Sequence, residues 1–218
     1  ILKSEQKKFK VVLSGGDTTQ STKLSITLAV LGYSKVKPVL RSGCKLNDDI
    51  YVTGNIGDSF LGLCIIKKKF NFGKLNNFFM KKFYEPEIPF KLQPYLHKIA
   101  NSSIDVSDGL LQDLSHICLF KKFGASIDLQ KLPLSAHCRY LVNNSKLKIQ
   151  NIFSNGDDYQ FLFTSSVNNR KKIERLSKKL NVKITKIGKI NNKKIITFKN
   201  NDKIYDARSI KMGYMHNF

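Results

Sequence analysis

Arginine is scarce in this sequence, long apolar runs are absent, and the few cysteines stand apart from one another. Only five of the 38 basic residues are arginine. No apolar run approaches the ~20 residues that a membrane-spanning helix requires, which excludes an integral membrane protein. The four cysteines include no C-x-x-C pair, so they indicate reduced cytosolic thiols rather than a disulfide or zinc framework. We therefore predict a cytoplasmic protein that has no membrane partner.

Acidic residues are also few, since 16 against 38 basic residues gives a formal charge of +22 over 218 residues. The lysines occur together with asparagine and isoleucine, as compositional drift would produce, and the simplest interpretation is a solvated lysine coat. A polyanion-binding surface is the alternative that the charge permits. Nucleic-acid-binding proteins usually rely on arginine, so its scarcity disfavours such a partner. Hydrophobic residues make up 41%, which excludes a wholly disordered chain.

Two further absences concern the start of the chain and the familiar catalytic motifs. The first residue is Ile1, the first methionine is Met80, and the opening ILKSEQKKFK has no apolar signal-peptide core. We therefore expect a chain that lacks its N-terminal part. The sequence contains no G-x-x-x-x-G-K-[ST], no H-R-D with D-F-G, and no G-x-S-x-G. P-loop NTPases and protein kinases are excluded, and nothing suggests a serine hydrolase.

Strand-like and helix-like segments interleave along the chain, which predicts an α/β or α+β fold. Short β-branched runs that end at turn residues predict strands, and spaced apolar residues predict helices. The predicted strands cover residues 11–13, 23–33, 48–54, 102–106, 125–129, 159–164, 182–188 and 193–199. The predicted helices cover residues 59–69, 95–100, 110–123 and 168–180, and Asp58 is the predicted cap of the first. The basic, aromatic stretch over 67–90 is predicted to be a loop in which the phenylalanines pack locally.

Three short segments combine acidic residues with glycine and are candidates for chemistry. The first, GGDTT (15–19), follows a predicted strand. Its adjacent glycines permit close approach of a phosphate, and Asp17 with two hydroxyls offers hard oxygen ligands for Mg²⁺. A plain tight turn capped by Asp17 explains the same residues equally well. The third segment, NGDDY (155–159), is by itself only a turn before a strand.

The second segment, DVSDGL (105–110), passes from a predicted strand to a predicted helix. Asp105 and Asp108 lie three positions apart across this turn, so their carboxylates can converge on one point. The helix N-terminus adds exposed amides and a dipole that favours anions. Such a turn suits metal-bridged phosphates, with carboxylates for the cations and amides for the anionic oxygens. The alternative is that Asp108 merely caps the helix and Asp105 is solvated.

Taken in this order, the segments resemble the thiamine-monophosphate kinase family, within the superfamily of aminoimidazole-ribonucleotide synthetases and selenophosphate synthetases. The matching stretches are GGDTT (15–19), LRSGCKLNDDIYVTGNIGDS (40–59), SIDVSDGLLQDLSHI (103–117), SNGDDYQFLFT (154–164) and GYMHNF (213–218). The resemblance implies an α/β (α+β) fold of the aminoimidazole-ribonucleotide synthetase type. Residues 1–46 would be the tail of an N-terminal ATP-binding and dimerisation domain, and residues 47–218 a C-terminal α/β sandwich domain.

The resemblance also implies an activity: ATP- and Mg²⁺-dependent phosphorylation of thiamine phosphate to thiamine diphosphate, by a homodimer in full-length members. Phosphoryl transfer between two anions depends on positioning and charge neutralisation, which Mg²⁺ ions held by carboxylates supply. By position, the implied metal ligands are Asp17, Asp105 and Asp108. The implied nucleotide contacts are Gly16, Asp17, Arg41 and Ser107. The implied substrate contacts are Asp157, where the family has Glu, and Tyr214, where it has the aromatic residue that contacts thiamine.

Several features depart from the family pattern. The family's first third, which carries further acidic motifs and dimer-forming strands, is missing. Asp157 is one methylene shorter than Glu, and Asn155 replaces a glycine, so Asn155 should adopt the backbone shape that glycine allowed. Besides a kinase fragment, two interpretations stay open: a catalytically inactive remnant that keeps the fold, and a half that needs a separate N-terminal partner. A basic nucleic-acid-binding module is a further alternative that rests on the charge alone.

Overall fold

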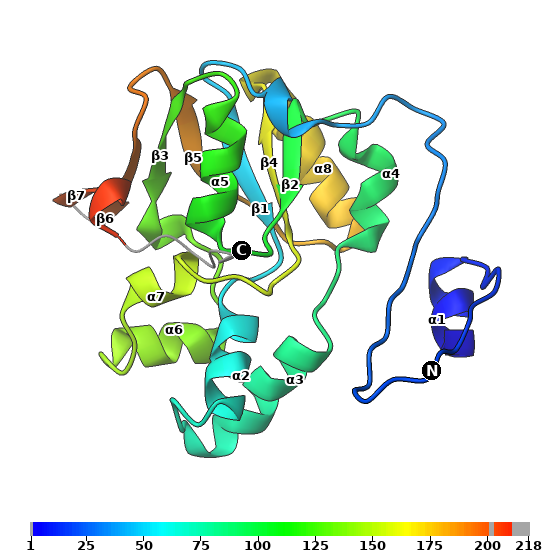
Figure 1. Cartoon of the computed structure of the whole chain (residues 1–218). Coiled ribbons are helices and arrows are strands. Elements are labelled where there is room, and N and C mark those ends of the chain that lie inside the picture. The colour runs from blue at the N-terminus through cyan, green and yellow to red at the C-terminus, as the bar shows by residue number, and fades with distance from the viewer. Residues whose placement is uncertain (1, 201–202, 211–218) are drawn as a thin grey trace. The chain divides into compact units, whose positions relative to one another are not determined.

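A computed structural model describes residues 2–200 and 203–210. The chain divides into two compact units, Ile1–Lys35 and Val36–Phe218, and each is described by itself. Figure 1 shows the elements of both units. Among the described residues, no helix is long and apolar enough to cross a membrane.

The first unit contains helix α1 (Leu2–Phe9) and no strand within its described residues. The strands predicted over 11–13 and 23–33 are therefore wrong. Their apolar side chains face solvent, since Val12 is 84% exposed and Leu31 is 95% exposed. A β-branched segment forms a strand only where a neighbouring strand takes its hydrogen bonds and a second layer covers its apolar face. The described part of the chain forms no strand beside these two segments.

The second unit is built on one seven-stranded sheet with the order β2-β4-β1-β5-β3-β6-β7. Its neighbouring strands are antiparallel except for β3 and β6, which are parallel. The strands are β1 (Asp49–Thr53), β2 (Ser102–Asp105), β3 (Gly124–Asp128), β4 (Phe161–Ser165), β5 (Ile184–Asn191), β6 (Ile196–Asn200) and β7 (Lys203–Asp206). The predicted α/β (α+β) class is confirmed, and six of these strands overlap predicted ones.

Helices cover both faces of this sheet (Figure 1). They are α2 (Asp58–Ile66), α3 (Asn76–Tyr84), α4 (Gln93–Leu96), α5 (Leu110–Leu119), α6 (Ala136–Asn143), α7 (Ile149–Phe153) and α8 (Arg170–Leu180). Every residue of β1 is buried, because alternate side chains enter two separate apolar clusters. Ile50 and Val52 belong to the larger cluster, and Tyr51 stacks on Phe163 in the smaller one beneath α8.

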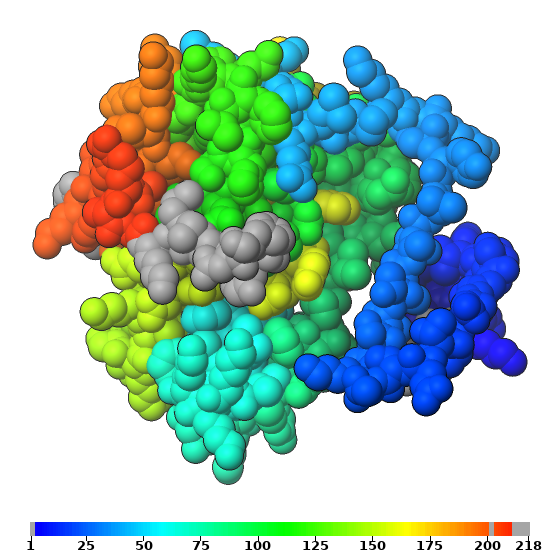
Figure 2. All heavy atoms as spheres, viewed as in Figure 1, coloured from blue at the N-terminus to red at the C-terminus, as the bar shows by residue number. Residues whose placement is uncertain are grey.

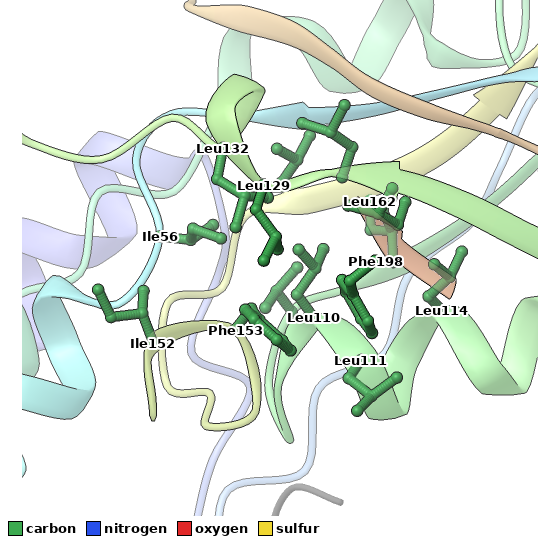
Figure 3. Close-up of a cluster of buried hydrophobic side chains, with 14 of the residues drawn as sticks. Ile56, Leu110, Leu111, Leu114, Leu129, Leu132, Ile152, Phe153, Leu162 and Phe198 are labelled. Atoms are coloured by element: carbon green, nitrogen blue, oxygen red, sulfur yellow. The ribbon is translucent and has the colours of Figure 1, made fainter. Parts of the chain in front are cut away.

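The larger cluster is the core on which the candidate site rests. Figure 3 shows Leu110, Leu111 and Leu114 of α5 gathered with Phe153 and Phe198 from α7 and β6. The Phe153 and Phe198 rings stack with their centroids 4.3 Å apart. In Figure 2 the orange and red atoms of β6 and β7 lie along one side of the green atoms of α5. The core therefore fixes the position of α5, and with it the connection that leads into the helix.

Two local predictions are wrong for reasons of packing. Residues 67–90 were predicted to be a loop, yet α3 lies within them because Phe79 is fully buried against α2. A side chain at Gly62 would stand 2.2 Å from the Phe79 carbonyl oxygen, so glycine permits this contact. Asp58 does not cap α2: Gly57, with φ +87°, takes the cap position, and the Asp58 carboxylate accepts a hydrogen bond from Ser135. The predicted local packing of the phenylalanines is confirmed.

Candidate functional site

The strand-to-helix connection at residues 106–109 is held against a second loop, residues 154–160. Asp105 is the last residue of β2, and α5 begins at Leu110. The Val106 amide donates to the Gln160 carbonyl at 2.8 Å, and the Tyr159 amide donates to the Val106 carbonyl at 2.9 Å. The Asp157 amide donates to the Ser107 carbonyl, also at 2.9 Å. Three backbone hydrogen bonds therefore join two segments that lie about fifty residues apart in the sequence.

Glycine makes this close approach possible. A side chain at Gly156 would stand 1.9 Å from the Ser107 carbonyl oxygen and 2.7 Å from the Gly109 amide nitrogen. Gly109, which precedes α5, has φ +131° and is itself crowded by the Ser154 backbone. Any larger residue at position 156 would separate the two loops.

Three carboxylates lie on these loops and share one electrostatic environment. Asp105, Asp108 and Asp157 are each partly buried. Burial raises the pKa of Asp157, and the Asp108 charge adds to this, while Lys67 opposes it. Burial also raises the pKa of the Tyr159 phenol, with further contributions from all three carboxylates. These charges therefore act across the loop junction.

The backbone of the second loop is unusual at two positions other than the predicted one. Asp157 has φ +68° and Tyr159 has φ +52°, both in the left-handed region. Such conformations are uncommon outside glycine and persist where surrounding structure enforces them. Asn155, in contrast, is not among the residues with positive φ, so the prediction of a glycine-like backbone at Asn155 is wrong. Its side-chain amide instead donates to the Asn151 carbonyl at 2.8 Å.

A buried carboxylate that the sequence analysis did not single out holds the first loop. One oxygen of Asp113, Oδ2, accepts hydrogen bonds from the amides of Ser107, Asp108 and Gly109 at 3.1, 3.3 and 3.1 Å. Burial raises the pKa of Asp113 to about 7 against the effect of these donors, and the neighbouring Asp108 and Asp105 charges contribute. The amides of residues 107–109 are therefore engaged within the protein, whereas the predicted anion site at the first amides of α5 stays a prediction. The alternative that Asp108 merely caps the helix is wrong, because Gly109 occupies the cap position.

A second missed carboxylate, Asp158, anchors the other loop. It is buried, and it accepts hydrogen bonds from the amides of Gly57 at 2.7 Å and Ser59 at 3.4 Å, at the start of α2. Burial raises the pKa of Asp158 to about 8 despite those two donors, and the nearby Asp58 charge contributes. The two adjacent acids of NGDDY thus have different surroundings. Asp158 accepts hydrogen bonds from the backbone at the start of α2, and Asp157 lies at the loop junction. The role of Asp113 could have been predicted, because it is an acid within the first turn of α5. The sequence around Asp158 contains no feature that indicates its role.

The other predicted site residues lie elsewhere. Gly16 and Asp17 belong to the first unit, where both are exposed and the Thr18 amide donates to Asp17 Oδ1 at 2.8 Å. Arg41 is exposed in a short 3₁₀ helix, and Tyr214 lies outside the described residues. Within residues 2–200 and 203–210, no three His, Cys, Asp or Glu side chains gather closely enough to hold a metal ion. The metal-ligand set of Asp17, Asp105 and Asp108 therefore stays a prediction.

Comparison with known proteins connects this junction with one family. No protein-family model matches the sequence. A thiamine-monophosphate kinase of Buchnera aphidicola is 40% identical over 188 residues, which are 84% of this chain and 57% of the relative. The thiamine-monophosphate kinase of Escherichia coli K12 is 37% identical over 186 residues, which are 84% of this chain and 56% of the relative.

Solved structures agree with these relatives. The thiamine-monophosphate kinase of Stenotrophomonas maltophilia has a TM-score of 0.67 at 28% identity, covering 74% of this chain and 52% of that chain. AaThiL complexed with AMPPCP and TMP has a TM-score of 0.62 at 26% identity, covering 77% of this chain and 53% of that one. The chain thus spans little more than half the length of the proteins that it matches.

Proposed function

The chain is homologous to thiamine-monophosphate kinases over 84% of its length, and on this premise we propose that it forms part of such a kinase. The reaction is transfer of the γ-phosphoryl group of ATP to thiamine phosphate, which gives thiamine diphosphate. The relative complexed with AMPPCP, an ATP analogue, and TMP supports these two substrates. Since the matched region is about half of each relative, the remainder of the site belongs to sequence outside this match.

The observation that carries the proposal is the loop junction, which joins Asp105, Asp108 and Asp157 into one acidic group. These partly buried carboxylates lie on two adjoining loops and repel one another, and a cation would stabilise them. Hard oxygen donors of this kind suit Mg²⁺. Asp105 and Asp108 would hold the ion, Asp17 stays the third ligand that the family resemblance implies, and the ion would neutralise charge on the phosphates during transfer.

The remaining residues of the proposed site fall into a nucleotide group and a substrate group. Gly16, Arg41 and Ser107 would contact the nucleotide. Both backbone groups of Ser107 are already engaged, the amide by Asp113 and the carbonyl by the Asp157 amide, so its contact with the nucleotide would use the hydroxyl. Asp157 and Tyr214 would contact thiamine phosphate. The division into a remnant of an ATP-binding and dimerisation domain (1–46) and a C-terminal domain (47–218), and the homodimer, belong to the same proposal.

The test joins this chain to the N-terminal part of a matching kinase and follows thiamine diphosphate formation with ATP and Mg²⁺ in excess. We expect turnover in the joined protein and little or none in the chain alone, because its carboxylates are only part of the ligand set. Turnover of about 1–100 per second, the range of ordinary kinases, by the chain alone would contradict this division of the site.

The role of the carboxylates is tested in the joined protein by Asp105→Asn and Asp108→Asn. Each change removes a negative oxygen at nearly constant volume, so turnover at limiting Mg²⁺ should fall strongly while the fold is kept. Glu174→Gln is the matched control, because Glu174 is an exposed acid that pairs with Lys178 on the surface of α8. If the two Asp variants behave like this control, the two residues are not metal ligands and the proposal fails.

A further inference from the structure

The start of α5 already contains an anion of its own. The first amides of a helix lack partners within the helix, and together with the helix dipole they commonly bind phosphate or a carboxylate. In the turn that leads into the ten-residue helix α5, Asp113 Oδ2 accepts from the three consecutive amides of Ser107, Asp108 and Gly109 at 3.1–3.3 Å. The Asp113 side chain is buried, with 1% of the residue exposed. One internal oxygen therefore engages all three amides of the turn that precedes the helix.

The hydrogen bonds to Asp113 change which groups of residues 105–109 are accessible to a ligand. The three amides that could receive an anion point inward to Asp113. The groups that stay partly exposed are the carboxylates at the two ends of the connection, Asp105 and Asp108. A turn with its donors engaged and its carboxylates exposed attracts cations and repels phosphate.

We propose that Asp113 is a positioning residue whose carboxylate acts as a built-in anion: it engages the amides of residues 107–109, so that this turn presents the Asp108 carboxylate to a cation instead of presenting amides to a phosphate. The cation is the one that accompanies the nucleotide, and in this respect the inference rests on the proposed function. Asp113 acts through the loop and touches neither substrate nor cation itself.

The opposite side of the loop supports this assignment. The Ser107 carbonyl accepts from the Asp157 amide, and the Gly156 backbone lies too close to Ser107 to leave room for a side chain. The loop is thus held on one face by main chain and on the other by the Asp113 carboxylate. Loss of Asp113 would free three amides without removing either exposed carboxylate.

The experiment follows the amides of residues 107–109 by NMR in the full 218-residue chain, at mildly alkaline pH. In the unmodified chain they should resist hydrogen exchange, and titration with inorganic phosphate should leave their shifts unchanged. In Asp113→Ala they should exchange at least about tenfold faster, as expected when hydrogen bonds to a charged group are lost. Phosphate should then shift the three signals, and added formate, which replaces the missing carboxylate, should restore their protection.

Two further variants keep the result interpretable. Asp113→Asn retains the volume and one acceptor oxygen, so it should fold even if Asp113→Ala does not, and it should show weaker protection of the same amides. Asp128→Ala is the matched control, because Asp128 accepts the Gln130 amide at 3.1 Å at the start of another helical turn. Asp128→Ala should leave residues 107–109 unchanged. The proposal is overturned if phosphate shifts these amides in the unmodified chain, or if Asp113→Asn and the unmodified chain exchange them equally fast.

A separate titration distinguishes failure of this inference from failure of the proposed function. Mn²⁺ should broaden the signals of Asp105 and Asp108 in the unmodified chain, and Asp113→Asn should weaken that effect about tenfold or more. Undiminished Mn²⁺ binding by the variant counts against the positioning role. Absence of broadening both in the unmodified chain and in the joined protein, together with engaged amides and no response to phosphate, supports the capture of the amides and counts against the metal site of the proposed function.

Discussion

Replacing Gly156 with alanine tests the loop junction directly. The new methyl carbon would start 1.9 Å from the Ser107 carbonyl oxygen, whereas a carbon and an oxygen in ordinary contact lie about 3.3 Å apart. The loops must therefore separate by about 1.4 Å. A movement of this size breaks the Asp157–Ser107 and Tyr159–Val106 hydrogen bonds, both 2.9 Å long.

The expected cost follows from these contacts. Each lost hydrogen bond contributes about 1 kcal/mol, and residual overpacking adds about 1–3 kcal/mol. Reduced freedom of the unfolded chain offsets about 0.4–1 kcal/mol. The free energy of unfolding should thus fall by about 2–5 kcal/mol in Gly156→Ala.

Urea unfolding followed by circular dichroism measures this difference, with Gly32→Ala as the control. A side chain at Gly32 would meet nothing within 4 Å, and Gly32 is not among the glycines with positive φ. The control should therefore lie within about 0.5 kcal/mol of the unmodified chain. If Gly156→Ala unfolds like this control, the two loops are not in the described contact.

Three other predictions concern stability and reactivity. Because burial raises the pKa of Asp158 to about 8, the folded chain keeps a proton on this carboxyl that the unfolded chain loses. The free energy of unfolding should therefore fall as the pH rises from about 4 to about 8. Thermal unfolding should show a smaller fall in Asp158→Asn. Phe153→Ala removes a fully buried ring that stacks on Phe198, and should lower the free energy of unfolding by about 3–5 kcal/mol in urea titrations. The four cysteine thiols are buried, and burial raises the pKa of Cys118 to about 12. A thiol reagent should therefore label none of the four rapidly until urea unfolds the chain. Rapid labelling of the folded chain would contradict their burial.

The parts of the fold that could be predicted from the sequence are those with local signals. Helix α8 has apolar residues at helical spacing, and β4 is a short aromatic and β-branched run after a turn. Helix α3 was missed because its short sequence, NNFFMKKFY, is weakly patterned and its stability comes from Phe79 packing onto α2. The strands expected before Arg41 failed for the converse reason: β propensity is realised only beside a partner strand.

The candidate site divides in the same way. The sequence motifs singled out Asp105 and Asp108 as metal ligands and Asp157 as a substrate contact, and the structure shows that their loops adjoin. The functions of Asp113 and Asp158 depend on which amides come within 3.5 Å of them, and loop packing decides this. An acid near a helix start is a common feature, so its partner cannot be named before the fold is known.

The two neighbouring acids of NGDDY have a consequence for genetics. Asp158 stabilises the protein by accepting the Gly57 amide, whereas Asp157 lies at the proposed site. Under the proposed function, alleles that change either codon would score alike in a screen for thiamine diphosphate supply, but for different causes. Alleles at position 158 should be conditional: growth at low temperature or a higher gene dose should suppress them, because enough folded protein then accumulates. Alleles at position 157 should resist both forms of suppression, since more molecules with an altered substrate contact remain poor in the same step.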